Sequence, residues 1–201
     1  MKKKFFILLS LSLLIFSNTS TISNAYSSDP KGFISEVVVE AKKILNSNID
    51  TNSKSKKLGE LALKTVDIVG IAYYTLGKYR KQFKADEKKE YLILFEKYFL
   101  KSFTSRLTDH SNPKIDVLEA EVLNSKYTIV KSLLLATSER PEVKIDWRVY
   151  TKDPNNPLIR DLIVEGLSLA RTQKEEFASV LETNNGDITK LFITLEEFIN
   201  K

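Results

Sequence analysis

The chain has 201 residues, of which 42% are hydrophobic and 28% are charged, a composition that predicts one folded domain and excludes a disordered chain. It has no cysteine, which excludes disulfides, thiol catalysis and thiolate metal sites, and its single histidine argues against a transition-metal centre. The formal net charge of +5 falls to +2 without the three lysines of residues 1–25, so charge gives little support for nucleic-acid binding.

Residues 1–25 have the pattern of a cleavable signal peptide. Three lysines precede an apolar run over 5–16, and Ser23-Asn24-Ala25 offers small residues at the positions that a signal peptidase reads. This run of 12 residues is shorter than the roughly 20 that a membrane helix needs, which favours cleavage over an uncleaved anchor. We therefore expect an exported protein whose mature form is one domain over 26–201.

The mature chain begins with helical periodicity. Asp29-Pro30 can start a helix, because proline is favourable in a first turn, and apolar residues recur at helical spacing over 33–45. A polar linker over 46–55 separates this helix from a second one, which we expect over 56–69.

A long aromatic helix follows a short apolar segment. The segment spans 68–76 and can end at Gly77. The helix, expected over 85–107, has acids in its first turn and carries Phe95 and Phe99 in its apolar stripe. Rings at this spacing usually form core, but the surplus of aromatic residues also suits the wall of a cavity.

The period then changes from helix to strand. In the third expected strand, Val143, Ile145, Trp147 and Val149 alternate with polar residues, which indicates one buried and one solvated face. Short turns between the strands predict an antiparallel meander. The four expected strands span 115–122, 127–137, 143–151 and 158–165.

Helical periodicity returns over 168–182 and over 187–199, separated by Asn184-Asn185-Gly186. The order of helices, strands and helices predicts an α+β fold, with a curved four-stranded antiparallel sheet packed against helices on one face. Such a sheet and its helices can enclose an apolar pocket where the side chains do not fill the interior.

Residues with catalytic potential are few. His110 lies in a polar loop, and no strained serine elbow accompanies it, so we interpret it as a solvated loop residue. Asp161 and Glu165 lie in an apolar strand and could act as buried acids or bases, but pairing with an arginine is the preferred interpretation.

Several segments, taken in order, resemble the MlaC family of periplasmic phospholipid-binding proteins, also called the toluene-tolerance auxiliary family. The first combines an aspartate, a short apolar helix, Leu-Gly and a basic residue, and a helix with Phe-x3-Phe spacing follows it. The second is a Val-Glu-Gly run that ends in phenylalanine. The matching residues are Asp67, Leu76-Gly77, Arg80, Phe95, Phe99, Phe103, Ile145-Asp146-Trp147-Arg148, Asp161, Val164-Glu165-Gly166 and Phe177.

This resemblance implies an NTF2-like layout and a soluble periplasmic phospholipid carrier rather than an enzyme. Such a carrier needs no cofactor or metal and shuttles lipid between an outer-membrane lipoprotein complex and an inner-membrane ABC transporter, which maintains outer-membrane lipid asymmetry. The size and modest charge suit a monomer that does not bind nucleic acid. The expected lipid-binding wall is Ile68, Ala72, Leu76, Phe95, Phe99, Val143, Ile145, Trp147, Val149, Leu162 and Val164.

Two other functions stay open from the sequence. An enzyme on a similar cone-shaped α+β fold would use Asp161, Glu165 or Tyr150 as acid or base, and it predicts a perturbed carboxylate that points into a pocket. A ligand-free adaptor of an envelope complex predicts a filled core.

Overall fold

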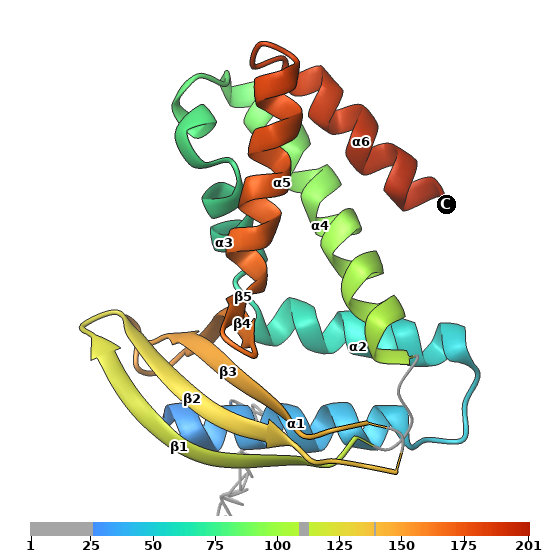
Figure 1. Ribbon diagram of the computed structural model, residues 1–201, viewed down its shortest axis with the longest axis vertical. Coiled ribbons are helices and arrows are strands. Elements are labelled where there is room, and N and C mark those ends of the chain that lie inside the picture. The colour runs from blue at the N-terminus through green and yellow to red at the C-terminus, as the bar shows by residue number, and fades with distance from the viewer. Residues whose placement is uncertain (1–25, 109–112, 139) are drawn as a thin grey trace, which may run out of the picture.

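The computed structural model describes residues 26–108, 113–138 and 140–201. The expected signal peptide and His110 lie outside the described residues. Figure 1 shows two parts: a curved sheet with α1 along it, and a group of helices, α3 to α6, that stands away from the sheet. Among the described residues, no helix combines the length and apolar character needed to cross a bilayer.

The N-terminal helices begin at aspartates that cap them. Asp29, Asp50 and Asp67 each accept a hydrogen bond from a backbone N–H in the first turn of the following helix. The helices of this half are α1 (Pro30–Leu45), α2 (Thr51–Thr65), α3 (Ile68–Thr75), the 3-10 helix η1 (Gly77–Lys81) and α4 (Ala85–Thr108).

The predicted helix over 56–69 is wrong at both ends. Asp50 starts α2 five residues earlier, inside the segment expected to be a linker. At the other end Val66 is extended and forms a parallel bridge with Ile159, and the N–H of Asp67 donates to the carbonyl of Ile159 (2.9 Å). This contact with the sheet ends α2 and separates it from α3.

The sheet has five strands in the order β1-β2-β3-β4-β5, all antiparallel, so the predicted meander is confirmed and the predicted count of four is corrected. The additional strand forms because Glu165 and Gly166 adopt positive φ angles of 49° and 82° and turn the chain tightly. The strands are β1 (Ile115–Asn124), β2 (Tyr127–Leu134), β3 (Val143–Tyr150), β4 (Leu158–Val164) and β5 (Leu167–Ser168).

The described residues form three hydrophobic clusters, the smallest of which joins α1 and α2 through Ile44, Leu45, Leu58 and Leu61. Helix α1 covers part of one sheet face, where Phe33, Ile34 and Val37 pack against Val130, Val149 and Ile159. The larger core joins α3, α4, α5 (Leu169–Thr183) and α6 (Ile188–Asn200), and Tyr91, Phe95, Leu181 and Leu191 are at most 1% exposed there. The α+β class is therefore confirmed.

Candidate functional site

The six predicted sheet residues of the site share one face. Strand register places Trp147 opposite Val130 and Leu162, and it places Ile145 opposite Ser132 and Val164. Because directly paired residues project to the same side of a sheet, these apolar side chains form one continuous surface.

Helix α1 covers only part of this surface. Val149 is fully buried beneath α1, whereas five side chains on the same face are only half-buried. We call these five the open sheet face: Val143, Ile145, Trp147, Leu162 and Val164. Leaving such a row partly in water is unfavourable at about 25 cal/mol per Å² of apolar surface, so it marks a binding surface more often than a structural one.

Hydrogen bonds fix the largest ring of the open sheet face. The indole N–H of Trp147 donates to the Ser132 hydroxyl (2.9 Å), and that hydroxyl donates to the carbonyl of Ile145 (2.8 Å). The polar atom of the indole is therefore satisfied within the protein, and its carbon surface remains for an apolar ligand.

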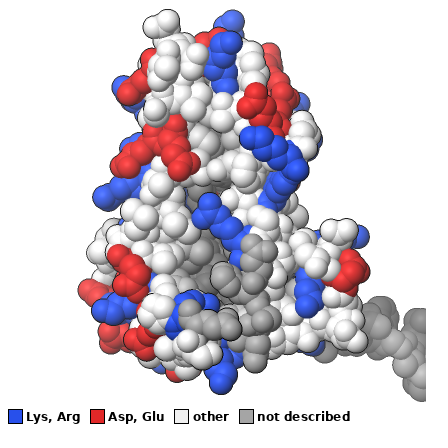
Figure 2. Space-filling view, turned by 45° about the vertical axis from the view of Figure 1, so that its right-hand side comes forward, with Lys and Arg blue, Asp and Glu red and all other residues white. Residues whose placement is uncertain are grey.

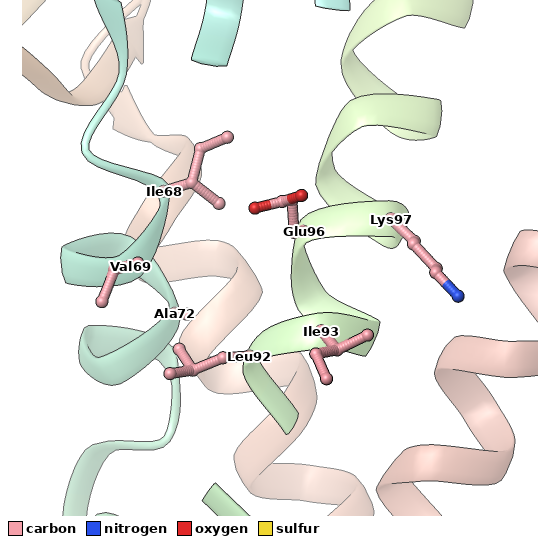
Figure 3. Close-up of a pocket in the computed structure, with 7 residues that line it drawn as sticks. All are labelled: Ile68, Val69, Ala72, Leu92, Ile93, Glu96 and Lys97. Atoms are coloured by element: carbon pink, nitrogen blue, oxygen red, sulfur yellow. The ribbon is translucent and has the colours of Figure 1, made fainter. Parts of the chain in front are cut away.

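The predicted helix residues divide between a pocket and the core. Ile68 and Ala72 line a cavity of about 180 Å³ between α3 and α4, together with Val69, Leu92, Ile93, Glu96 and Lys97 (Figure 3). In Figure 3 Ile68 of α3 and Leu92 and Glu96 of α4 point into the space between the two helices, whereas Val69, Ile93 and Lys97 lie at its outer edges.

Leu76 and Phe95 are 1% exposed and contact only protein neighbours in the helical core. The Phe95 ring meets that of Phe177 edge-on at 6.2 Å. Phe99 is half-buried, and its ring stacks with those of Phe95 and Phe103. The expected single wall is thus distributed over the open sheet face, the α3–α4 pocket and the helical core.

Sequence reasoning missed Leu92 as a residue of the α3–α4 pocket, and it also missed two exposed aliphatic residues there, Val69 and Ile93. They are 51% and 52% exposed, and Ile93 lies outside the apolar stripe of its helix. An isoleucine displaced from the stripe was the one signal that could have identified it.

The surface is hollowed between the helices and the sheet. Figure 2 shows this hollow near the middle of one face, with lysine and arginine side chains beside it.

The carboxylates considered for catalysis have structural roles. The Asp161 side chain is 1% exposed and accepts hydrogen bonds from the Ser168 hydroxyl (2.6 Å) and the Ala170 N–H (3.0 Å), and it lies 3.4 Å from the Arg148 guanidinium. Glu165 is exposed and accepts from the Lys144 N–H (2.5 Å).

The third catalytic candidate, Tyr150, is also held by its neighbours. Its ring lies 5.5 Å from that of Tyr127, and the Arg160 guanidinium lies 4.4 Å above its centre. No group of three or more potential metal ligands occurs among the described His, Asp and Glu residues. The described geometry thus favours a binding surface over a reaction centre.

The fold is that of a lipid-binding protein of known structure. It matches a phospholipid-binding protein from Ralstonia solanacearum, solved in complex with a phospholipid, with a TM-score of 0.71 over 87% of this chain and 97% of that chain. The two sequences are 18% identical. The family model of the MlaC protein matches residues 35–197, and the chain belongs to the MlaC family.

Proposed function

We propose that this protein binds a phospholipid and holds its acyl chains between the open sheet face and the helices, in an NTF2-like layout. The observation that carries the proposal is the row of half-buried apolar side chains on β3 and β4, of which Trp147 alone packs against the core that α1 forms with the sheet. Membership of the MlaC family and the fold shared with a protein solved around a phospholipid support the same ligand class.

The energetics suit a lipid. Each methylene group removed from water contributes about 0.8 kcal/mol, so two acyl chains bind strongly without specific polar contacts. The α3–α4 pocket, at about 180 Å³, is smaller than the roughly 300–1,000 Å³ of common ligand sites. Two acyl chains therefore need more room than this pocket offers, and in the proposed complex they also lie along the open sheet face.

The proposed carrier works in the periplasm, to which the segment over 1–25 directs it. It passes phospholipid between an outer-membrane lipoprotein complex and an inner-membrane ABC transporter, and so maintains the lipid asymmetry of the outer membrane. It acts as a monomer and performs no covalent chemistry. The structural roles of Asp161 and Glu165 support a binding protein rather than an enzyme.

Native mass spectrometry of the protein purified from the periplasm of a Gram-negative host tests this function. We expect a co-purified mass that matches a phospholipid, and we expect the substitution L162R to lower its occupancy because a guanidinium on the open sheet face opposes an acyl chain. The matched control is L123R at the end of β1, where Leu123 is 53% exposed.

Circular dichroism establishes that both variants are folded, and I145S provides a milder change on the same face if L162R does not fold. A wild-type protein that is free of lipid after purification from the periplasm would refute the proposal. Equal lipid occupancy in L162R, I145S and L123R would show that the open sheet face is not the binding surface.

A further inference from the structure

One face of the helical part combines exposed aliphatic, tyrosine and basic side chains. Val69 and Ile93 are about half exposed at the rim of the α3–α4 pocket, and Tyr74 on α3 is 42% exposed. We call this the α3–η1 face and define it by Val69, Tyr73, Tyr74, Arg80, Lys81, Ile93 and Lys174.

The cations of the α3–η1 face lie against its tyrosines. The Arg80 guanidinium is 4.0 Å from the centre of the Tyr73 ring, and the Lys174 ammonium is 5.3 Å from the centre of the Tyr74 ring. Cation–π contact orients these long side chains along the rings but leaves their charge uncompensated.

Few acids neutralise this charge. Lys78 pairs with Glu182 (2.8 Å), whereas Arg80, Lys81 and Lys174 form no ion pair with any described carboxylate. Glu96 lines the pocket beside Val69 and Ile93, and Lys97 lines the pocket with it.

The members of the α3–η1 face are continuous in space. Val69 and Tyr73 are one turn apart on α3, and Val69 shares the α3–α4 pocket with Ile93 of α4. The Lys174 side chain of α5 passes close to Gly77, where an added Cβ would lie 2.9 Å from its Cε. Helices α3, α4 and α5 and the 3-10 helix η1 therefore contribute to this face, which borders the pocket at Val69 and Ile93.

We propose that the α3–η1 face docks onto the headgroup layer of an anionic phospholipid membrane. Tyrosine is enriched at membrane interfaces because its ring is apolar and its hydroxyl is polar, and lysine and arginine near an anionic bilayer are attracted to it. Val69 and Ile93 are the aliphatic groups that enter between the headgroups. The inference goes beyond the proposed function, because a lipid pocket does not require the protein to bind a membrane directly.

Vesicle flotation of the full mature protein tests the docking. We expect binding to vesicles of equal parts phosphatidylglycerol and phosphatidylcholine at low ionic strength, with weaker binding to phosphatidylcholine alone or at high salt. Each basic residue near the surface changes the partition coefficient about fivefold, so R80Q/K81Q/K174Q should lower it roughly a hundredfold.

Two further variants separate docking from a general charge effect. The control K56Q/K57Q/K64Q removes the same charge from exposed positions of α2 and should leave flotation nearly unchanged. The variant V69S/I93S keeps the charge and should still reduce binding, because it removes the aliphatic groups that enter the headgroup layer.

Absence of flotation with anionic vesicles at low salt overturns the proposal, and so does an equal loss in the α2 control. If the face binds only an acidic protein and not vesicles, the proposal is also overturned. Native mass spectrometry on the same samples reports bound phospholipid separately, so a failure of docking can be distinguished from a failure of the proposed lipid-binding function.

Discussion

Replacing Asp161 with alanine tests whether this buried carboxylate is a structural element or part of a reaction site. Its two oxygens accept from the Ser168 hydroxyl and the Ala170 N–H, at the point where the sheet ends and α5 begins. Arg148 lies 3.4 Å from the same carboxylate on the neighbouring strand. The substitution D161A leaves both donors and the arginine without their acceptor.

The size of the stability loss expected for D161A follows from the burial of the Asp161 carboxylate. An unsatisfied buried donor costs about 1–3 kcal/mol, and two donors lose their partner here. The Arg148 side chain is 31% exposed, so water screens its pairing with Asp161 and adds little to the cost. We expect a loss of about 3 kcal/mol in the free energy of unfolding, which corresponds to a melting temperature lower by roughly 6–12 °C for a chain of this size.

Urea unfolding followed by circular dichroism measures this change. The control is D116A, because Asp116 is an exposed acid on β1 and its removal should change stability by less than about 0.5 kcal/mol. A loss below about 1 kcal/mol for D161A, or a gain, would refute the reasoning. A gain in particular is typical of a catalytic group kept at the expense of stability, and it would revive the enzyme interpretation.

Two further predictions concern the helical part. The substitution G70A should lower the free energy of unfolding by about 1–3 kcal/mol, because the added Cβ would lie 2.5 Å from the Arg160 Nε and 2.6 Å from the Asp67 carboxylate. This loss should be smaller in an R160A background, and urea unfolding of the double-mutant cycle measures the difference. Burial raises the pKa of Tyr91 above its ordinary value of 10.0, so the stability contributed by the neutral phenol is complete below pH 10 and falls as the pH rises above it. The substitution Y91F removes the hydrogen bond to Thr75 (2.7 Å) and should lower the free energy of unfolding by about 1 kcal/mol at neutral pH. It should also reduce the loss of stability at alkaline pH, which unfolding at a series of pH values measures. An unchanged loss of stability at alkaline pH would contradict this prediction.

The sheet could be predicted from the sequence because its signal is local. The alternation of apolar and polar residues along β3 predicted that Ile145 and Trp147 share a face, and the short turns predicted the antiparallel meander. The boundary between α2 and α3 could not be predicted, because Val66 leaves the helix to pair with Ile159, more than 90 residues away. Local periodicity contains no information on such a contact.

The site was predictable only in part for the same reason. An apolar residue on an amphipathic helix faces either a cavity or another helix, and the sequence pattern is identical in both cases. Phe95 was expected to line a pocket, but it packs against Phe177 of α5 in the core. Which outcome holds depends on where α5 and α6 return after the sheet, and that is a property of the whole fold.

The way in which the sheet core and the helical core are joined bears on how the proposed ligand enters. Among the described residues, the sheet core and the helical core have only Val66 in common, as a partly buried neighbour of both. Two polar connections also join them: Arg160 of β4 pairs with Asp67 at the start of α3, and Asp161 holds the start of α5. A third cluster is apolar and brings Ile44 of α1 and Leu58 of α2 together with Leu107 of α4. In the proposed opening, the hydrogen bonds at these two points act as pivots and the sheet core and the helical core stay intact, while the cluster around Leu107 has to yield. In the proposed complex, acyl chains between the two parts contact the open sheet face and remove its apolar surface from water.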